Sequence, residues 1–219
     1  TIEAADGATF SHDSFAGMGP DAIDLESDIY STNIAVGEGR YRAENNIDIR
    51  QDTFSGFSSD WFANIQPQVP GVQEHGIHLT FNTIDNASPL VEVVGAPLGS
   101  TTKPYFTQGV SIVGNTDLQP AGSTHGGSIT VPFVGSAMTL DNVVALTVAF
   151  NNFPLFDGTC DPPASYTYFC DTPYLAAAQL NDVAYGSVGA NKFSGALGVL
   201  NPASSNNAWL SVSGNTSGA

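Results

Sequence analysis

Two histidines and a glutamate lie within five residues of one another, and this cluster has clear potential for chemistry. Glu74, His75 and His78 fall in the segment QEHGIHLTF. His75 and His78 are an odd number of residues apart, so on a regular strand they point to opposite faces. Gly76 would permit a bulge that brings them to one face, where two imidazoles suit a metal. The sequence leaves this metal site open but favours two separate surface or hydrogen-bonded histidines.

A second candidate for metal binding is the acidic segment PDAIDLESDIY. It contains Asp21, Asp24, Glu26 and Asp28. Calcium takes about six to eight oxygen ligands, which carboxylates in a loop can supply. The spacing differs from that of an EF-hand, and a solvated acidic loop explains the same residues. Calcium is the one cofactor that the sequence suggests.

Glycoside hydrolysis needs two carboxyl groups about 5 to 9 Å apart across a groove. Four glutamates sit on or beside expected strands: Glu38, Glu44, Glu74 and Glu92. Nothing in the sequence forces two of them together. The G-x-S-x-G motif that carries a nucleophilic serine is absent as well, since Ser58 is followed by Ser59 and Asp60. Whether the chain is an enzyme stays open, and a protein without catalysis is favoured.

Exposed aromatic rings would support a different activity, the binding of a neutral glycan on a sheet face. Trp61, Tyr105 and Trp209 are the candidates for stacking against sugar rings. Core packing is the competing explanation for each ring, because large aromatic side chains dominate protein interiors.

The charge of the chain excludes more functions than its motifs support. The chain has 219 residues, five Lys and Arg against 21 Asp and Glu, and a net charge of −16. Such a surface repels phosphate backbones and anionic lipid head groups, so nucleic-acid and membrane-surface partners are not expected. No apolar run approaches the roughly 18 residues of a membrane span, so membrane insertion is not expected either.

The two cysteines would indicate an oxidising compartment if they form a disulfide, and two buried free thiols are the alternative. Cys160 and Cys170 are ten residues apart among Asp, Pro and Gly, as in a disulfide that closes a surface loop. Thr1 in place of Met would be left by removal of a signal peptide. We therefore expect a secreted protein, extracellular or at the cell surface.

Apolar residues alternate along the chain, which predicts strands. Ile77, Leu79 and Phe81 alternate with polar residues, and Asp85 to Ser88 suits the turn of a hairpin into a strand over 90–94. Further strands are expected over 41–49, 110–113, 129–134, 143–150, 193–200 and 208–212. The segment 173–185 is the best candidate for a helix. We find no internal repeat.

Short strands separated by Gly and Pro predict one all-β domain over residues 1–219: an antiparallel two-sheet sandwich or jelly roll with at most one or two short helices. The segment 1–15 would pair with a sheet edge, of its own subunit or of a neighbour.

These observations favour a secreted structural or adhesion subunit, such as a filament subunit, that assembles through N-terminal strand addition. Its partners would be copies of itself or other extracellular components. The alternative is a module that binds or cleaves a neutral glycan on a jelly-roll fold.

Overall fold

The computed structural model describes eleven stretches of the chain: residues 6–16, 22–26, 45–55, 62–66, 74–85, 91–95, 107–118, 136–154, 176–194, 200–202 and 207–218. All secondary structure in these stretches is β-strand. No helix among them is long and apolar enough to cross a membrane.

The strands form three sheets, and the chain visits them in turn. Sheet 1 contains β1 (Thr9–Ser11), β4 (Asn45–Arg50), β7 (Glu74–Thr80), β10 (Thr107–Val113), β13 (Val143–Val144), β14 (Thr147–Ala149), β17 (Ala184–Gly189) and β20 (Ala208–Ser213). Sheet 2 contains β2 (Ser14–Ala16), β5 (Thr53–Ser55), β8 (Thr83–Asp85), β11 (Thr116–Asp117), β15 (Asn152–Pro154), β18 (Lys192–Ser194) and β21 (Thr216–Gly218). Sheet 3 contains β3 (Ile23–Glu26), β6 (Ala63–Gln66), β9 (Val91–Val94), β12 (Ser136–Asp141), β16 (Ala176–Asn181) and β19 (Leu200–Pro202).

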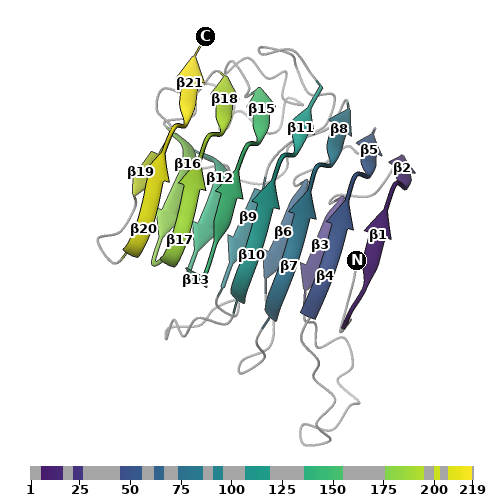
Figure 1. Cartoon of the computed structure of the whole chain (residues 1–219), viewed down its shortest axis with the longest axis horizontal. Helices are drawn as coiled ribbons and strands as arrows, with labels where there is room; N and C mark the ends of the chain where they lie inside the picture. Colours follow the sequence, from purple (N-terminus) through teal and green to yellow (C-terminus); the bar gives the residue numbers. More distant parts are fainter. Residues whose placement is uncertain are drawn as a thin grey trace, which may run out of the picture.

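Every strand pair in these sheets is parallel, so the fold is a parallel β-helix. One circuit of the chain, here called a rung, contributes a segment to each sheet and stacks on the rung before it. Figure 1 shows sheet 1 in chain order from β1 (purple) to β20 (yellow), with sheet 3 behind it and sheet 2 beyond the strand tips. The predicted antiparallel sandwich or jelly roll is therefore wrong. Alternation identifies a strand with one buried face, but it is the same in both architectures.

The core is a set of apolar columns that run along the inside of the stack. Ile49 lies beside Leu79, Leu79 beside Ile112, and Ile112 beside Val148, in successive strands of sheet 1. All four side chains are buried. Val93, Leu140 and Leu180 continue the core in sheet 3. Each buried side chain of this size contributes about 1.5 to 3 kcal/mol relative to exposure.

Two local predictions fail for the same reason. The hairpin expected at residues 85–88 does not form, because β8 and β9 belong to different sheets. The helix expected over 173–185 is replaced by β16 and the start of β17. Ala178 and Leu180 alternate into the core beside Met138 and Leu140, so tertiary pairing overrides the helix propensity of the alanines. The strand expected over 129–134 lies outside the described residues.

A ladder of asparagines fixes the corner between sheets 1 and 2. It runs through Asn82, Asn115, Asn151, Asn191 and Asn215, one per rung. Each of the first four donates a hydrogen bond from its backbone N–H, and another from its side-chain amide, to Oδ1 of the next asparagine; these bonds are 2.8 to 3.1 Å long. The ladder shows that the chain does contain an internal repeat, contrary to our expectation. Its members are 33, 36, 40 and 24 residues apart, so no fixed period reveals it.

Candidate functional site

The outer face of sheet 1 belongs to the sheet with the most described strands, eight against seven and six. It lies toward the viewer in Figure 1. Its outward residues alternate with the buried ones, so they follow from the strand register. In the last four rungs they are small and uncharged: Ser111, Val113, Thr147, Ala149, Ser187, Gly189, Ser211 and Ser213. We call these eight residues the neutral floor.

Two columns of residues in the left-handed backbone region run along the borders of sheet 1. The first border precedes the central part of each strand and consists of Gly7, Asn46, Gly76, Gly109, Ala145, Tyr185 and Trp209. The second border follows it and consists of His12, Gln51, Phe81, Gly114, Phe150, Ala190 and Gly214. The same two bends in every rung give the sheet its regular width. Glycine suits such positions, whereas bulky residues rarely adopt them.

Four of these border positions carry exposed aromatic residues. Phe81 and Phe150 are 61% and 68% exposed on the second border, and Tyr185 and Trp209 are 64% and 79% exposed on the first. The rings of Tyr185 and Trp209 are parallel, with an interplanar angle of 2° and centroids 6.3 Å apart. The ring of Phe81 lies over Gly114, 2.5 Å from where a Cβ atom would be. Sheet 1 therefore has a small-residue floor with aromatic side chains on both sides.

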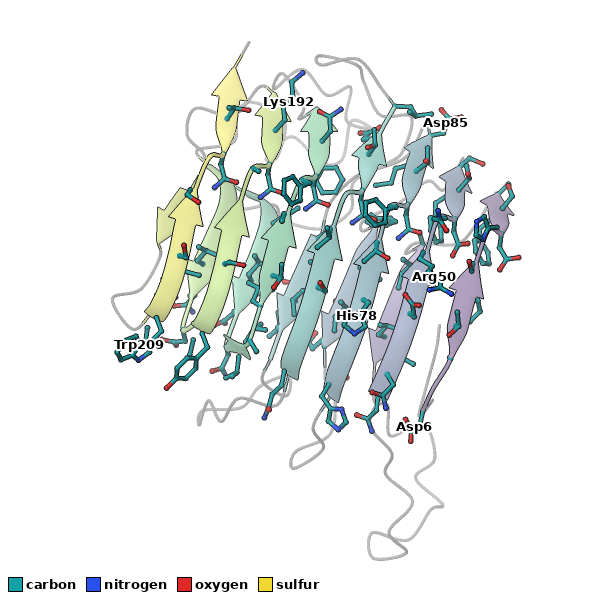
Figure 2. The ribbon with its side chains drawn as sticks, viewed as in Figure 1. Asp6, Arg50, His78, Asp85, Lys192 and Trp209 are labelled. Carbon is teal, nitrogen blue, oxygen red and sulfur yellow. The ribbon has the colours of Figure 1, made fainter. Side chains whose placement is uncertain are left out.

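Charge on this face is confined to the early rungs. Asp48 and Arg50 form an ion pair of 3.3 Å, and His78 lies beside Asp48 in the next strand. Figure 2 shows Arg50 and His78 on this half of the face, with Trp209 at the far end of the lower border. Lys192 and Asp85 lie away from the face, at the side of sheet 2.

The described residues around the histidine cluster do not make up a metal centre. Gly76 does adopt the left-handed conformation expected for it, with a φ of 70°, and both His75 and His78 are exposed. Neighbouring strands place Asn45 and Gln108 beside His75, and Asp48 and Ser111 beside His78. Within the described residues, no group of three or more His, Cys, Asp or Glu could hold a metal ion.

The acidic calcium candidate is only partly described. Asp24 and Glu26 lie on β3, two residues apart, with Asn64 and Gln66 beside them on β6. Asp21 and Asp28 lie outside the described residues.

Of the four carboxylate candidates for glycoside hydrolysis, the two that the structure describes, Glu74 and Glu92, lie on strands of different sheets. Glu74 is buried on β7, where it accepts a hydrogen bond of 3.3 Å from the Thr107 hydroxyl. Glu92 is on β9, in a different sheet. Glu38 and Glu44 lie outside the described residues.

The predicted disulfide finds no support in the described part of the chain. The described stretches contain no disulfide, and both Cys160 and Cys170 lie outside them.

Of the three predicted stacking residues, Trp61 and Tyr105 also lie outside the described residues, while Trp209 is exposed rather than packed in a core. Sequence reasoning missed Phe81, Phe150 and Tyr185. Phe81 and Phe150 each come one residue before a ladder asparagine, and Tyr185 comes three residues before the buried Val188. These equivalent positions become visible only when the rungs are aligned.

The comparisons with known proteins do not supply a function. No family model, no curated protein and no solved structure matches the chain.

Proposed function

We propose that this chain is a structural or adhesion subunit of an extracellular assembly, and that it works by contact through the outer face of sheet 1. The observation that carries the proposal is the pair of aromatic borders around the neutral floor. The extracellular location rests on composition, since a surface with so little charge is made largely of Ser, Thr, Asn and Gly.

The aromatic residues of the two borders cost an isolated chain conformational free energy. A residue with a side chain loses roughly 1 kcal/mol in the left-handed region. Phe150, Tyr185 and Trp209 each adopt this conformation and yet remain mostly exposed, so burial within the chain offsets little of that cost. Aromatic residues are enriched in protein interfaces, where they bury a large area with few rotatable bonds. A partner that covers these rings would offset the cost.

Charge favours a second copy of the chain as this partner. Two chains with a net charge of −16 repel each other, and the repulsion falls when their nearest surfaces are uncharged. The neutral floor is such a surface, while Asp48 and Arg50 already compensate each other within the early rungs. Small side chains also let two sheets approach to the usual separation of about 10 Å.

The size of the face limits the strength of one contact. Seven rungs about 4.8 Å apart and about six residues across give a face of roughly 30 by 20 Å, or about 600 Å². A stable complex buries about 800 Å² on each partner, so a single contact here is weak. A second contact at β1 would reinforce it. β1 pairs with β4 along one edge, and in the described residues no strand pairs with its other edge. Strand addition there would build larger assemblies.

Lysines on the face test this proposal. The double variant Thr147→Lys, Ser187→Lys places two like charges on the neutral floor. The matched control Thr83→Lys, Thr116→Lys places the same charges on the outer side of sheet 2, where Thr83 and Thr116 are neighbours. Sedimentation velocity over a range of concentrations should show association of the wild type and the control, and its loss in the face variant. Equal association of all three, or a wild type that stays monomeric at millimolar concentration, contradicts the proposal.

A neutral glycan is the second candidate partner, and the parallel rings of Tyr185 and Trp209 favour it. A glycan array followed by calorimetry with each neutral glycan that binds is the test. Binding that is lost in Trp209→Ala and kept in Phe150→Ala would support the glycan, because Phe150 lies on the opposite border. An array on which no neutral glycan binds reproducibly would contradict this second candidate.

A further inference from the structure

Asp52 occupies a place in the ladder that asparagine fills in the five rungs after it. Its Oδ1 accepts a hydrogen bond of 2.8 Å from the backbone N–H of Asp13, and its own N–H donates to Oδ1 of Asn82 at 3.1 Å. These are the same backbone-to-side-chain bonds that join the asparagines. The residue is 1% exposed. Asp52 therefore belongs to the ladder by geometry and differs from the other members by chemistry.

The difference lies in the second side-chain atom. In each asparagine, Nδ2 also donates to a main-chain carbonyl one rung back: Asn82 to Ile49 at 2.9 Å, and Asn115 to Leu79 at 2.9 Å. Phe10 is the neighbour of Ile49 on β1. The Phe10 carbonyl therefore has the same position in the stack relative to Asp52 as the Ile49 carbonyl has relative to Asn82. An ionised Asp52 presents an oxygen where the ladder requires a donor. That atom, Oδ2, is buried and has no hydrogen-bond partner.

We propose that Asp52 is a proton-binding site that completes the ladder and tightens the first rung, β1 to β3, against the second in acid. The proton is carried on Oδ2, which then donates to an acceptor of the column as Nδ2 does in asparagine. Loss of the proton leaves acceptors facing one another and a buried charge, both of which weaken the contact between the rungs.

The charged neighbours of Asp52 agree with this assignment. Burial is the main cause that raises the pKa of Asp52 above its ordinary value, and the carboxylates of Asp13 and Asp48 raise it further. The Asp13 N–H and the charge of His12 act in the opposite direction. His12 and Asp13 come from the first rung, Asp48 lies on the same rung as Asp52, and the ladder partner on the next rung, Asn82, is neutral.

The direction of the pH effect follows from the raised pKa. Below the ordinary value of 3.8 the carboxyl is protonated whether or not the rung is docked, and the ladder is complete. As the pH rises through the folded-state pKa, the proton is lost and the docking of the first rung weakens. Each unit by which the folded pKa exceeds the ordinary one changes the docking equilibrium about tenfold.

The test combines a titration with amide hydrogen exchange. The carboxyl ¹³C shift of Asp52 in the wild-type chain should titrate above its ordinary value. Protection of the Asp48 and Thr53 amides reports docking, because they donate to the Ala8 and Asp13 carbonyls of the first rung at 2.9 Å. Asp52→Asn should raise their protection at pH 7, leave it unchanged near pH 3.5, and leave the protection of the Thr116 amide, two rungs on from Asp52, as it was. Asp85→Asn removes one exposed charge and serves as the control.

Two results would overturn the assignment. One is an Asp52 carboxyl that titrates at or below its ordinary value, which the wild-type chain reveals even if the variant does not fold. The other is a protection change that is the same at both pH values, or the same in Asp85→Asn, since that would reflect general charge removal.

Discussion

Asn115 donates two hydrogen bonds to a single atom, the Oδ1 of Asn151, from its backbone N–H and from its side-chain amide, each at 3.0 Å. Asn151 repeats the arrangement toward Asn191 and also donates to the Ile112 carbonyl at 2.8 Å. Each buried amide in the middle of the ladder is thus fully bonded, and adjacent rungs can stack in one register only.

The first prediction concerns this ladder. Asn151→Ala removes the acceptor shared by two donors of Asn115 and leaves buried polar groups without partners, each at a cost of about 1 to 3 kcal/mol. We expect the free energy of unfolding to fall by about 3 kcal/mol in chemical denaturation. Asn152→Ala, at the next residue but on the outer side of sheet 2, is the control and should change it by less than about 0.5 kcal/mol. Equal losses would show that the ladder contributes little.

The second prediction concerns Gly114, which has a φ of 69° beneath the ring of Phe81. Gly114→Ala should lower the free energy of unfolding by about 1 to 2 kcal/mol, because the methyl group is strained and also displaces the ring. The loss should shrink in a Phe81→Ala background, as a double-mutant cycle would measure. No coupling between the two sites would mean that Phe81 does not cover Gly114 in solution.

The third prediction separates the two faces of β10. Ile112→Ala opens a cavity in a fully buried column and should cost about 2 to 5 kcal/mol of unfolding free energy. Val113→Ala, one residue on and directed outward, should cost less than about 1 kcal/mol. A larger loss of unfolding free energy in Val113→Ala than in Ile112→Ala would contradict the assignment of Ile112 to the core side of sheet 1.

The fourth prediction sets stability against function. Asparagine tolerates the left-handed region better than phenylalanine, so Phe150→Asn should raise the free energy of unfolding by about 0.5 to 1 kcal/mol. The same variant should weaken self-association, because one border loses its ring. Weaker folding together with unchanged association would argue that Phe150 serves the fold and not a partner.

Parts of this fold were predictable because they are local. Ile47 and Ile49, like Ile77 and Leu79, alternate with polar residues, and this alternation identifies strands at the correct places. Which strands pair, and in which direction, is decided by long-range contacts that alternation does not encode. The segment around Ala178 shows the limit, since its alanines favour a helix until the register with β12 makes it a strand.

The repeat that encodes the pairing was present in the sequence but irregular. Asp52-Thr53-Phe54, Asn82-Thr83-Ile84 and Asn151-Asn152-Phe153 share a polar ladder residue followed two positions later by a buried one. Rungs of 24 to 40 residues hide this pattern from a search at a fixed period. The aromatic borders were harder to foresee, because nothing in the sequence around Tyr185 signals a positive φ.

The most direct measurement of the central claim is site-specific crosslinking of the chain to itself. A photo-crosslinking amino acid would replace Ser187 on the neutral floor or, in a matched variant, Thr83 on the outer side of sheet 2. After irradiation of the concentrated chain, we predict covalent dimers from position 187 and few from position 83. Dimers from position 83 alone, or none from either position, would contradict a contact surface on the face of sheet 1.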